Sequence, residues 1–387
     1  MRSSRLISAL LLSGSLLASS ATVSLAQVEA EEVAAAPPAT EWTVVEDAPW
    51  PAKKDWWLYD AAATPDGDVV VVGGPFGGQV NAWTTADGET WVTSPLPFEQ
   101  ASHPWMSETP WGIELFAGTG ASQVMSSTVD GEKWSKPTTF KKALLSGRDV
   151  TASTAMLAGA TGRLPKSTPA LWRSEEGGKY ERLGLGDVRK KSYAAGVAVL
   201  PDNELLVATN NPTTRKPKLH RGSWGGNWED VALPTGGPAQ PDFLALAGVA
   251  DGIVLSAQDR ESHVLWFSPD GANWEVVTEA SPGYRPIQSG DDVLILGDPI
   301  LRSSNGTDWC ELGAPEGEVN LWGMTEFPDG RLLLVGVEHR KVKKNKPAVT
   351  FPTAWVTDDV NCEPDTPESE MARDESETSR SEVGEGE

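Results

Sequence analysis

The chain has 387 residues and a formal net charge of −23, from 55 acidic and 32 basic side chains. An acidic chain of this kind is a poor partner for nucleic acid, whose phosphates repel it. The two cysteines and four histidines form no zinc-ligand pattern, and we expect no metal and no other cofactor.

The first 26 residues have the pattern of a secretory signal peptide. Arg2 and Arg5 form a basic start, residues 6–18 are mostly apolar, and Ser24-Leu25-Ala26 offers a cleavage site. An uncleaved anchor is the alternative, although the apolar run is short and broken by Ser and Gly. We expect a secreted, extracellular protein without membrane insertion, with a disordered linker over 27–40.

A short pattern, Ser/Thr-x-Asp-Gly-x-x-Trp, recurs through residues 41–362. Complete copies begin at Thr85, Thr128 and Ser268, and the copy at Ser303 has Asn in place of Asp. Weaker copies end at Tyr180, Trp228 and Cys362, and successive copies lie 35 to 53 residues apart. This is the length of a four-stranded propeller blade. Asp-Gly suits a tight β-turn, and the Trp can pack between blades.

A second set of turns lies between these motifs, as at Pro65-Asp66-Gly67 and Pro328-Asp329-Gly330. Each turn precedes a short apolar run bounded by Gly, which predicts a strand. No segment has helical periodicity. Each repeat therefore predicts four strands, a to d, with a turn between a and b, a loop between b and c, and the Asp-Gly turn between c and d. We expect an all-β, seven-bladed β-propeller over 41–362.

The seventh repeat ends at Cys362 and lacks a fourth strand. Residues 41–49, EWTVVEDAP, resemble the fourth strands of the other repeats. We expect this N-terminal strand to close blade seven and so to remove the open sheet edges. In an exported chain we also expect a disulfide between Cys310 and Cys362, which would join the closing blade to its neighbour.

Residues 363–387 form an acidic tail with ten Asp or Glu and almost no large apolar side chain. Such a segment buries too little surface to offset its chain entropy, so we expect it to be disordered. It is either a plain solvated tail or an electrostatic lid or spacer.

The repeated motif resembles the Asp-box, or BNR, repeat of sialidase-like β-propellers. The resemblance implies the propeller fold, with the Asp box as a structural turn on the face opposite the active site. Sialidases of this type use three arginines, one near the first blade, and a Tyr nucleophile. This chain has no Arg between Arg5 and Arg148, so the resemblance assigns no catalytic residue.

Strand order gives the expected propeller two distinct faces. The a–b and c–d turns share one, the turn face, and the b–c loops and d–a connections share the other, the loop face. Propellers usually bind ligands through such variable loops. We expect a binding surface of basic and aromatic side chains on the loop face: Arg163, Lys166, Arg215, Lys216, Arg260, Arg285, Arg340 and Lys343, with Trp57, Trp105, Tyr193 and Trp322.

A basic face on an acidic chain predicts an anionic partner, either an anionic polysaccharide or an acidic protein surface. Aromatic side chains near a propeller axis suit stacking on sugars. The alternative is that the cations only solubilise long loops and the aromatics only pack between blades. We expect a monomeric, non-catalytic binding or scaffold protein. A glycan hydrolase or lyase of sialidase-like fold is the alternative, although spacing selects no pair of carboxylates.

Overall fold

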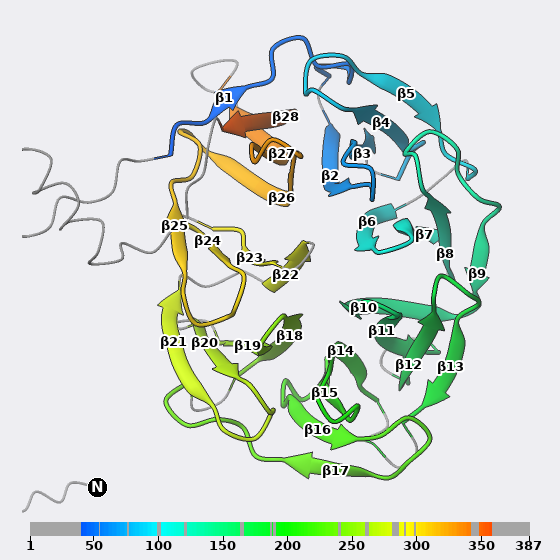
Figure 1. Cartoon of the computed structure of the whole chain (residues 1–387), viewed down its shortest axis with the longest axis vertical. Coiled ribbons are helices and arrows are strands. Elements are labelled where there is room, and N and C mark those ends of the chain that lie inside the picture. Colours follow the sequence, from blue (N-terminus) through cyan, green and yellow to red (C-terminus); the bar gives the residue numbers. More distant parts are fainter. Residues whose placement is uncertain are drawn as a thin grey trace, which may run out of the picture. The chain divides into compact units, whose positions relative to one another are not determined.

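The computed structural model describes residues 40–357, with gaps at 54, 76, 99–101, 120–121, 163–165, 186–187, 189–190, 239–240, 260–262, 281–285, 290–291, 298 and 342–347. The described residues form 28 β-strands and no helix. These strands build seven four-stranded antiparallel sheets arranged around a central axis (Figure 1). The protein is an all-β, seven-bladed propeller, as the repeat predicted. The expected signal peptide, linker and acidic tail lie outside the described residues.

Each of the first four blades is a continuous stretch of chain. Blade one holds β2 (Trp56–Ala63), β3 (Val69–Pro75), β4 (Asn81–Thr85) and β5 (Val92–Pro95). Blade two holds β6 (Ser102–Thr109), β7 (Gly112–Thr119), β8 (Ser122–Thr128) and β9 (Thr138–Phe140). Blade three holds β10 (Ala143–Val150), β11 (Thr154–Thr161), β12 (Thr168–Glu175) and β13 (Glu181–Gly184). Blade four holds β14 (Tyr193–Val199), β15 (Leu205–Asn210), β16 (Lys218–Gly222) and β17 (Trp228–Val231).

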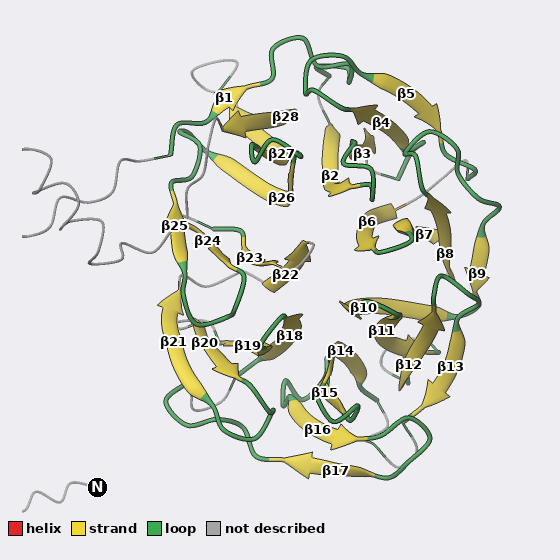
Figure 2. Cartoon of the chain, in the orientation of Figure 1, coloured by secondary structure: helices red, strands yellow, loops and turns green. Residues whose placement is uncertain are grey.

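The last three blades follow the same order, except that blade seven draws on both ends of the described chain. Blade five holds β18 (Phe243–Val249), β19 (Gly252–Gln258), β20 (His263–Ser268) and β21 (Glu275–Ala280). Blade six holds β22 (Pro286–Ser289), β23 (Asp292–Ile295), β24 (Ile300–Ser303) and β25 (Cys310–Leu312). Blade seven holds β26 (Val319–Glu326), β27 (Leu332–Arg340), β28 (Val349–Thr357) and β1 (Thr43–Val44). Strand a of every blade lies nearest the axis (Figure 2).

The core is divided into seven apolar clusters, and each cluster joins two neighbouring blades. Between blades one and two, Val70 and Val72 of β3 pack with Ile113 and Leu115 of β7. Strand β3 is buried on both faces, with Val69 to Val72 all fully enclosed. This explains why the second strand of each repeat reads as a continuous apolar run rather than an alternating one. All seven junctions between blades are filled in this way.

The aromatic residue of each motif packs into the junction with the preceding blade. Six junctions receive Trp91, Trp134, Tyr180, Trp228, Trp274 and Trp309 in this way. The junction between blades six and seven receives Trp42, just before β1, whose indole N–H donates to the carbonyl of Gly313. The N-terminal segment thus supplies the ring that the seventh copy of the motif, with Cys362 in the Trp position, does not encode.

The Asp-Gly turns are held by the side chains of the motif itself. Asp87 accepts hydrogen bonds from the backbone N–H groups of Thr90 (2.7 Å) and Glu89 (2.8 Å), which lower the pKa of its carboxyl to about 2. The N–H of Gly88, whose φ of +79° suits glycine, donates to the Thr85 hydroxyl at 2.9 Å. Asn305 accepts the same two backbone bonds in its turn, so the motif tolerates an amide.

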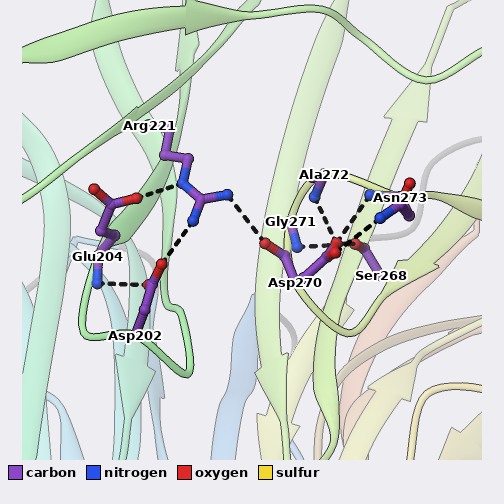
Figure 3. A network of polar contacts seen from close by, with 8 residues as sticks. All are labelled: Asp202, Glu204, Arg221, Ser268, Asp270, Gly271, Ala272 and Asn273. Atoms are coloured by element: carbon purple, nitrogen blue, oxygen red, sulfur yellow. Dashed lines mark hydrogen bonds and ion pairs between the residues drawn. The ribbon is translucent and has the colours of Figure 1, made fainter.

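Arginines on the turn face join these turns across blades. Arg221 of blade four pairs with Glu204 (2.5 Å) and Asp202 (2.7 Å) of its own blade and donates to the carbonyl of Asp270 in blade five (3.3 Å; Figure 3). Arg331 of blade seven donates in the same way to the carbonyl of Asp87 in blade one, at 3.0 Å. The turn face is therefore an ordered ionic surface.

The pairing at the junction of the chain ends is short. Strand β1 lies antiparallel to β28, with Thr43 opposite Val356 and Val44 opposite Trp355, whereas the sequence predicted a strand over 41–49. Cys310, at the start of β25, packs beside the cluster between blades six and seven. Its expected disulfide partner, Cys362, lies outside the described residues, so both the disulfide and the closure of the ring stay predictions.

If the N-terminal segment closes the circle of seven blades, replacing Trp42 with Ala will lower the free energy of unfolding by about 1 to 3 kcal/mol. The reason is that the indole of Trp42 is lost from the cluster between blades six and seven. Urea denaturation of the purified protein measures this. Val44→Ala is the matched control, because Val44 is exposed and should change stability by less than about 0.5 kcal/mol. Equal stability of Trp42→Ala and wild type would contradict closure by this segment.

Candidate functional site

The loop face carries the predicted basic side chains that the structure describes. Lys166, Arg215, Lys216 and Arg340 are exposed there. Two of them pair with acids: Arg215 with Asp242 at 3.3 Å, and Arg340 with Glu338 at 2.7 Å. The other predicted cations, Arg163, Arg260, Arg285 and Lys343, lie outside the described residues.

Two of the four predicted aromatics meet at the loop-face end of the axis. The rings of Trp57 and Trp322 lie 5.8 Å apart, and Trp57 stacks on Tyr59 at 6.5 Å. These three rings, here named the aromatic row, come from the first strands of blades one and seven, which are neighbours (Figure 1). Trp322 is 43% exposed, more than any other aromatic side chain of the described residues.

A β-bulge places two of these rings. In β2 the pairing with β3 slips by one residue at Tyr59, and in β26 the pairing with β27 slips at Trp322. A bulge re-aims the extra side chain away from the regular sheet direction. The inner strands of blades three and four have the same slip at Ser146 and Ala195, so the position recurs while its side chain varies.

The other two predicted aromatics do not join this row. Trp105 stacks on Phe116 at 4.3 Å and packs against the cluster between blades two and three. It therefore packs between blades, which was the alternative to sugar binding for the predicted aromatics. Tyr193 begins β14 in blade four and is half-buried. The predicted aromatics therefore do not form a single ring around the axis.

Below the aromatic row, the inner strands carry a group of charged side chains that the sequence reasoning did not place, here named the polar cluster: Asp60, Glu108 and Arg148. Burial raises the pKa of Asp60 to about 7, although the Arg148 charge opposes the rise. Burial likewise lowers the pKa of Arg148 against the attraction of Asp60 and Glu108. Arg148 also lies over the ring of Trp105, 5.9 Å from its centre.

The carboxylates of these inner strands hold neighbouring blades together. Asp60 accepts a backbone hydrogen bond from Met106 of blade two at 2.6 Å, and Asp149 accepts one from Val199 of blade four at 2.6 Å. Glu108 of blade two accepts from the backbone of Ala63 (2.7 Å) and the hydroxyl of Thr325 (2.8 Å), in blades one and seven. These acids are committed to structural bonds, which leaves little freedom for proton transfer to a ligand.

Blades three and six touch directly across the axis. The side chain of Gln288 in β22 accepts from the N–H of Val150 at 3.1 Å and donates to its carbonyl at 3.0 Å. Arg148 donates to the backbone carbonyl of Gln288 at 2.5 Å. Because β10 and β22 stand on different sides of the axis (Figure 1), these bonds obstruct passage from the aromatic row to the turn face.

Two hollows lined by described residues lie on the turn face. One, of about 230 Å³, lies beside Glu108, Asp292, Arg302 and Glu326. Its charges are already paired, since Arg302 bonds both Asp292 and Glu326. The other, of about 680 Å³, lies across the a–b turns of blades three, four and five. The sequence reasoning had assigned ligand binding to the opposite face and did not foresee either hollow.

The described part of the chain holds no group of three His, Cys, Asp or Glu side chains that could bind a metal ion. Within the same residues, no helix is long and apolar enough to cross a membrane.

No family model and no curated protein matches this sequence. Among solved structures, virginiamycin B lyase from Staphylococcus aureus is similar with a TM-score of 0.54 and 12% identity, over 82% of this chain and 99% of that one. A fucose-binding lectin from Aleuria aurantia gives 0.41 and 14%, over 68% of this chain and all of that one. A sialidase from Trypanosoma rangeli gives 0.39 and 10%, over 79% of this chain and 55% of that one.

These likenesses are fold-level resemblances among propellers, and at such low identity they carry no activity over to this chain. The neighbours include a lectin and a sialidase. Membership of the Asp-box family stays a prediction.

The raised pKa of Asp60 makes a pH dependence testable. The carboxyl of Asp60 has a pKa near 4 in the unfolded chain and about 7 in the folded protein, so the folded state keeps its proton up to a higher pH. This contribution to stability is complete below pH 4 and is lost as the pH rises to about 7. Urea denaturation across this range should show a smaller decline for Asp60→Asn than for wild type. Asp66→Asn, in an exposed turn, is the control, and parallel profiles for Asp60→Asn and wild type would refute the assignment.

Proposed function

We propose that this protein is a secreted, non-catalytic carbohydrate-binding propeller whose loop face takes an anionic glycan. The observation that carries the proposal is the aromatic row, with Trp322 held 43% exposed beside Trp57. An exposed indole is unfavourable in water unless a partner covers it, and sugars stack their apolar C–H faces on such rings.

Charge on the same two blades supports an anionic ligand. Lys53 precedes β2, and Arg340 and Lys341 lie at the end of β27. Neither Lys53 nor Lys341 has an acidic partner among the described residues. Both lysines are exposed and adjoin strands of the two blades that carry Trp57 and Trp322. A glycan with carboxylate or sulfate groups would therefore find stacking surface and positive charge on the same two blades.

The expected signal peptide supports an extracellular location for this binding. An extracellular acidic protein surface is the other partner with suitable charge. It would use the same cations but would not require the stacking geometry of the row, and for that reason we favour a glycan.

A glycan-active hydrolase or lyase is the second candidate. The pKa of Asp60, near 7, is a property expected of a general acid and favours this reading. Against it, both carboxyl oxygens of Asp60 accept backbone N–H groups, from Ala61 and Met106. Release of reducing ends or unsaturated sugars from a glycan by wild type, but not by Asp60→Asn, would establish the enzyme.

The proposal is tested by binding purified protein to immobilised polygalacturonate, hyaluronan and a neutral glucan at low and high salt. We expect binding to the two anionic polymers that weakens with salt. Trp322→Ala should weaken it about fivefold to tenfold, the range of about 1 to 1.4 kcal/mol expected for one stacked ring.

The matched control is Trp224→Ala, the same replacement on the turn face. It should leave binding to the anionic polymers unchanged. Failure of wild type to bind either anionic polymer would overturn the proposal, and so would an equal loss of binding in both Trp variants.

A further inference from the structure

The larger turn-face hollow has the size of a ligand site. Its volume of about 680 Å³ lies within the range of about 300 to 1,000 Å³ typical of small-molecule pockets. Three neighbouring a–b turns form its rim, and Ser153, Asn203 and Asp251 each come from a different one of blades three, four and five. It is therefore a feature of several blades together.

Trp224 forms one side of this hollow and occupies an unusual position. In the repeated motif it stands where the other copies have the turn-forming Asp, since Gly222-Ser223-Trp224-Gly225 aligns with Thr85-Ala86-Asp87-Gly88. That turn lacks the two carboxylate-to-backbone bonds that Asp87 and Asp270 make in theirs, and Gly225 keeps the positive φ of +76°. A residue that departs from a local rule at the wall of a hollow is a candidate for a functional role.

The ring of Trp224 is half-buried, because it packs against the cluster between blades three and four. Since Trp224 also lines the hollow, it contributes apolar surface there. The guanidinium of Arg173 lies over the same ring, 5.9 Å from its centre, and pairs with Glu175 at 2.5 Å. Arg173 thus contacts the Trp224 ring, while its positive charge is paired with the carboxylate of Glu175.

The rim offers hydrogen-bonding groups that the fold does not use. The side chains of Ser153, Asn203 and Asp251 are exposed, and none of them bonds another described residue. Together they present a hydroxyl, an amide and a carboxylate, which can all bind sugar hydroxyls. Asn203 is held in the left-handed region at φ +63°, which fixes its place on the rim.

The charge around the hollow selects against an anion. Asp251 lies on the rim, and the nearby turns of blades four and five carry Asp202, Glu204 and Asp270. The cations that could balance them, Arg173 and Arg221, are already paired. An aromatic wall with hydroxyl, amide and carboxylate groups suits an uncharged sugar.

We propose that this hollow is a second carbohydrate site, which binds a neutral oligosaccharide on the turn face through Trp224, Asn203 and Asp251. It is separate from the loop-face site and does not depend on that site's ligand. With both sites occupied, the propeller would bridge a neutral and an anionic glycan on opposite faces.

The test is a titration of the full mature protein with cellotetraose, xylotetraose, maltotetraose and chitotetraose, followed by calorimetry and by tryptophan fluorescence. We expect at least one of them to bind wild type. The decisive variant is Trp224→Asp, which restores the motif carboxylate. The restored backbone hydrogen bonds offset part of the packing that is lost with the ring, so the variant should stay folded, as checked by circular dichroism, yet bind the same sugar at least tenfold more weakly.

Asp251→Asn should weaken binding by about threefold, while Asp66→Asn, the equivalent change in the blade-one turn, should have no effect. Trp322→Ala should also bind the neutral sugar normally, which separates this site from the loop face. The proposal is overturned if none of the four sugars binds wild type, or if Trp224→Asp binds as well as wild type. Because the loop-face proposal is tested with anionic polymers and Trp322→Ala, either proposal can fail alone.

Discussion

The packing between neighbouring blades is the interaction on which the rest of this structure depends. A single four-stranded sheet of this length has two apolar faces and cannot bury either alone. Seven clusters, one at each junction, remove both faces from water. Each junction also takes one aromatic ring, from the turn that leads into an outer strand, from the first residue of such a strand or, between blades six and seven, from Trp42 just before β1. The sequence repeats because every blade needs the same apolar strands and the same aromatic residue to fill its junctions.

The repeated residues build the junctions and the turns, and they occupy equivalent positions in most blades. Departures from the repeat then mark the functional candidates. The bulge position that holds Ser146 and Ala195 in blades three and four holds Tyr59 and Trp322 in blades one and seven. The motif Asp is replaced by Trp224 in blade four. Both departures place an aromatic ring where other blades have Ser, Ala or Asp, on opposite faces of the propeller.

In the polar cluster and at the neighbouring Asp149, carboxylates near the axis accept backbone hydrogen bonds from adjacent blades. Three or more inner strands converge there, and their backbone N–H groups need acceptors where neighbouring sheets do not pair. Asp60, Glu108 and Asp149 meet that need, each bonding the backbone of an adjacent blade. The raised pKa values of Asp60 and Asp149 follow from burial. A shifted pKa at this place in the fold therefore accompanies a structural role and does not by itself indicate catalysis.

The fold could be predicted from the sequence because its determinants are local and repeated. Asp-Gly turns, apolar second strands and the motif Trp each act within a few residues, and the register of blades follows from their spacing. The exposure of Trp322 beside Trp57 depends on a bulge, which periodicity does not reveal. The contact of Gln288 with Val150 and the stacking of Trp105 on Phe116 join residues of different strands, and no spacing rule indicates them.

The turn-face hollow was missed for a related reason. Its rim is made of turn residues that sequence reasoning had assigned a structural role, and their side chains meet only because three blades stand side by side. One signal was available: Trp224 stands at a position where the motif calls for Asp. The charged pair Arg148 and Asp149 within the inner strand β10 is a second such signal, for the polar cluster.

The central claim is that the loop-face aromatic row is a glycan-binding surface. Oxidative footprinting with mass spectrometry tests it most directly, by comparing the oxidation rate of each tryptophan with and without polygalacturonate oligosaccharides. The account predicts that oxidation of Trp322 and Trp57 slows on binding while that of Trp224 is unchanged. Unchanged oxidation of Trp322 under conditions where the oligosaccharide is bound would contradict it.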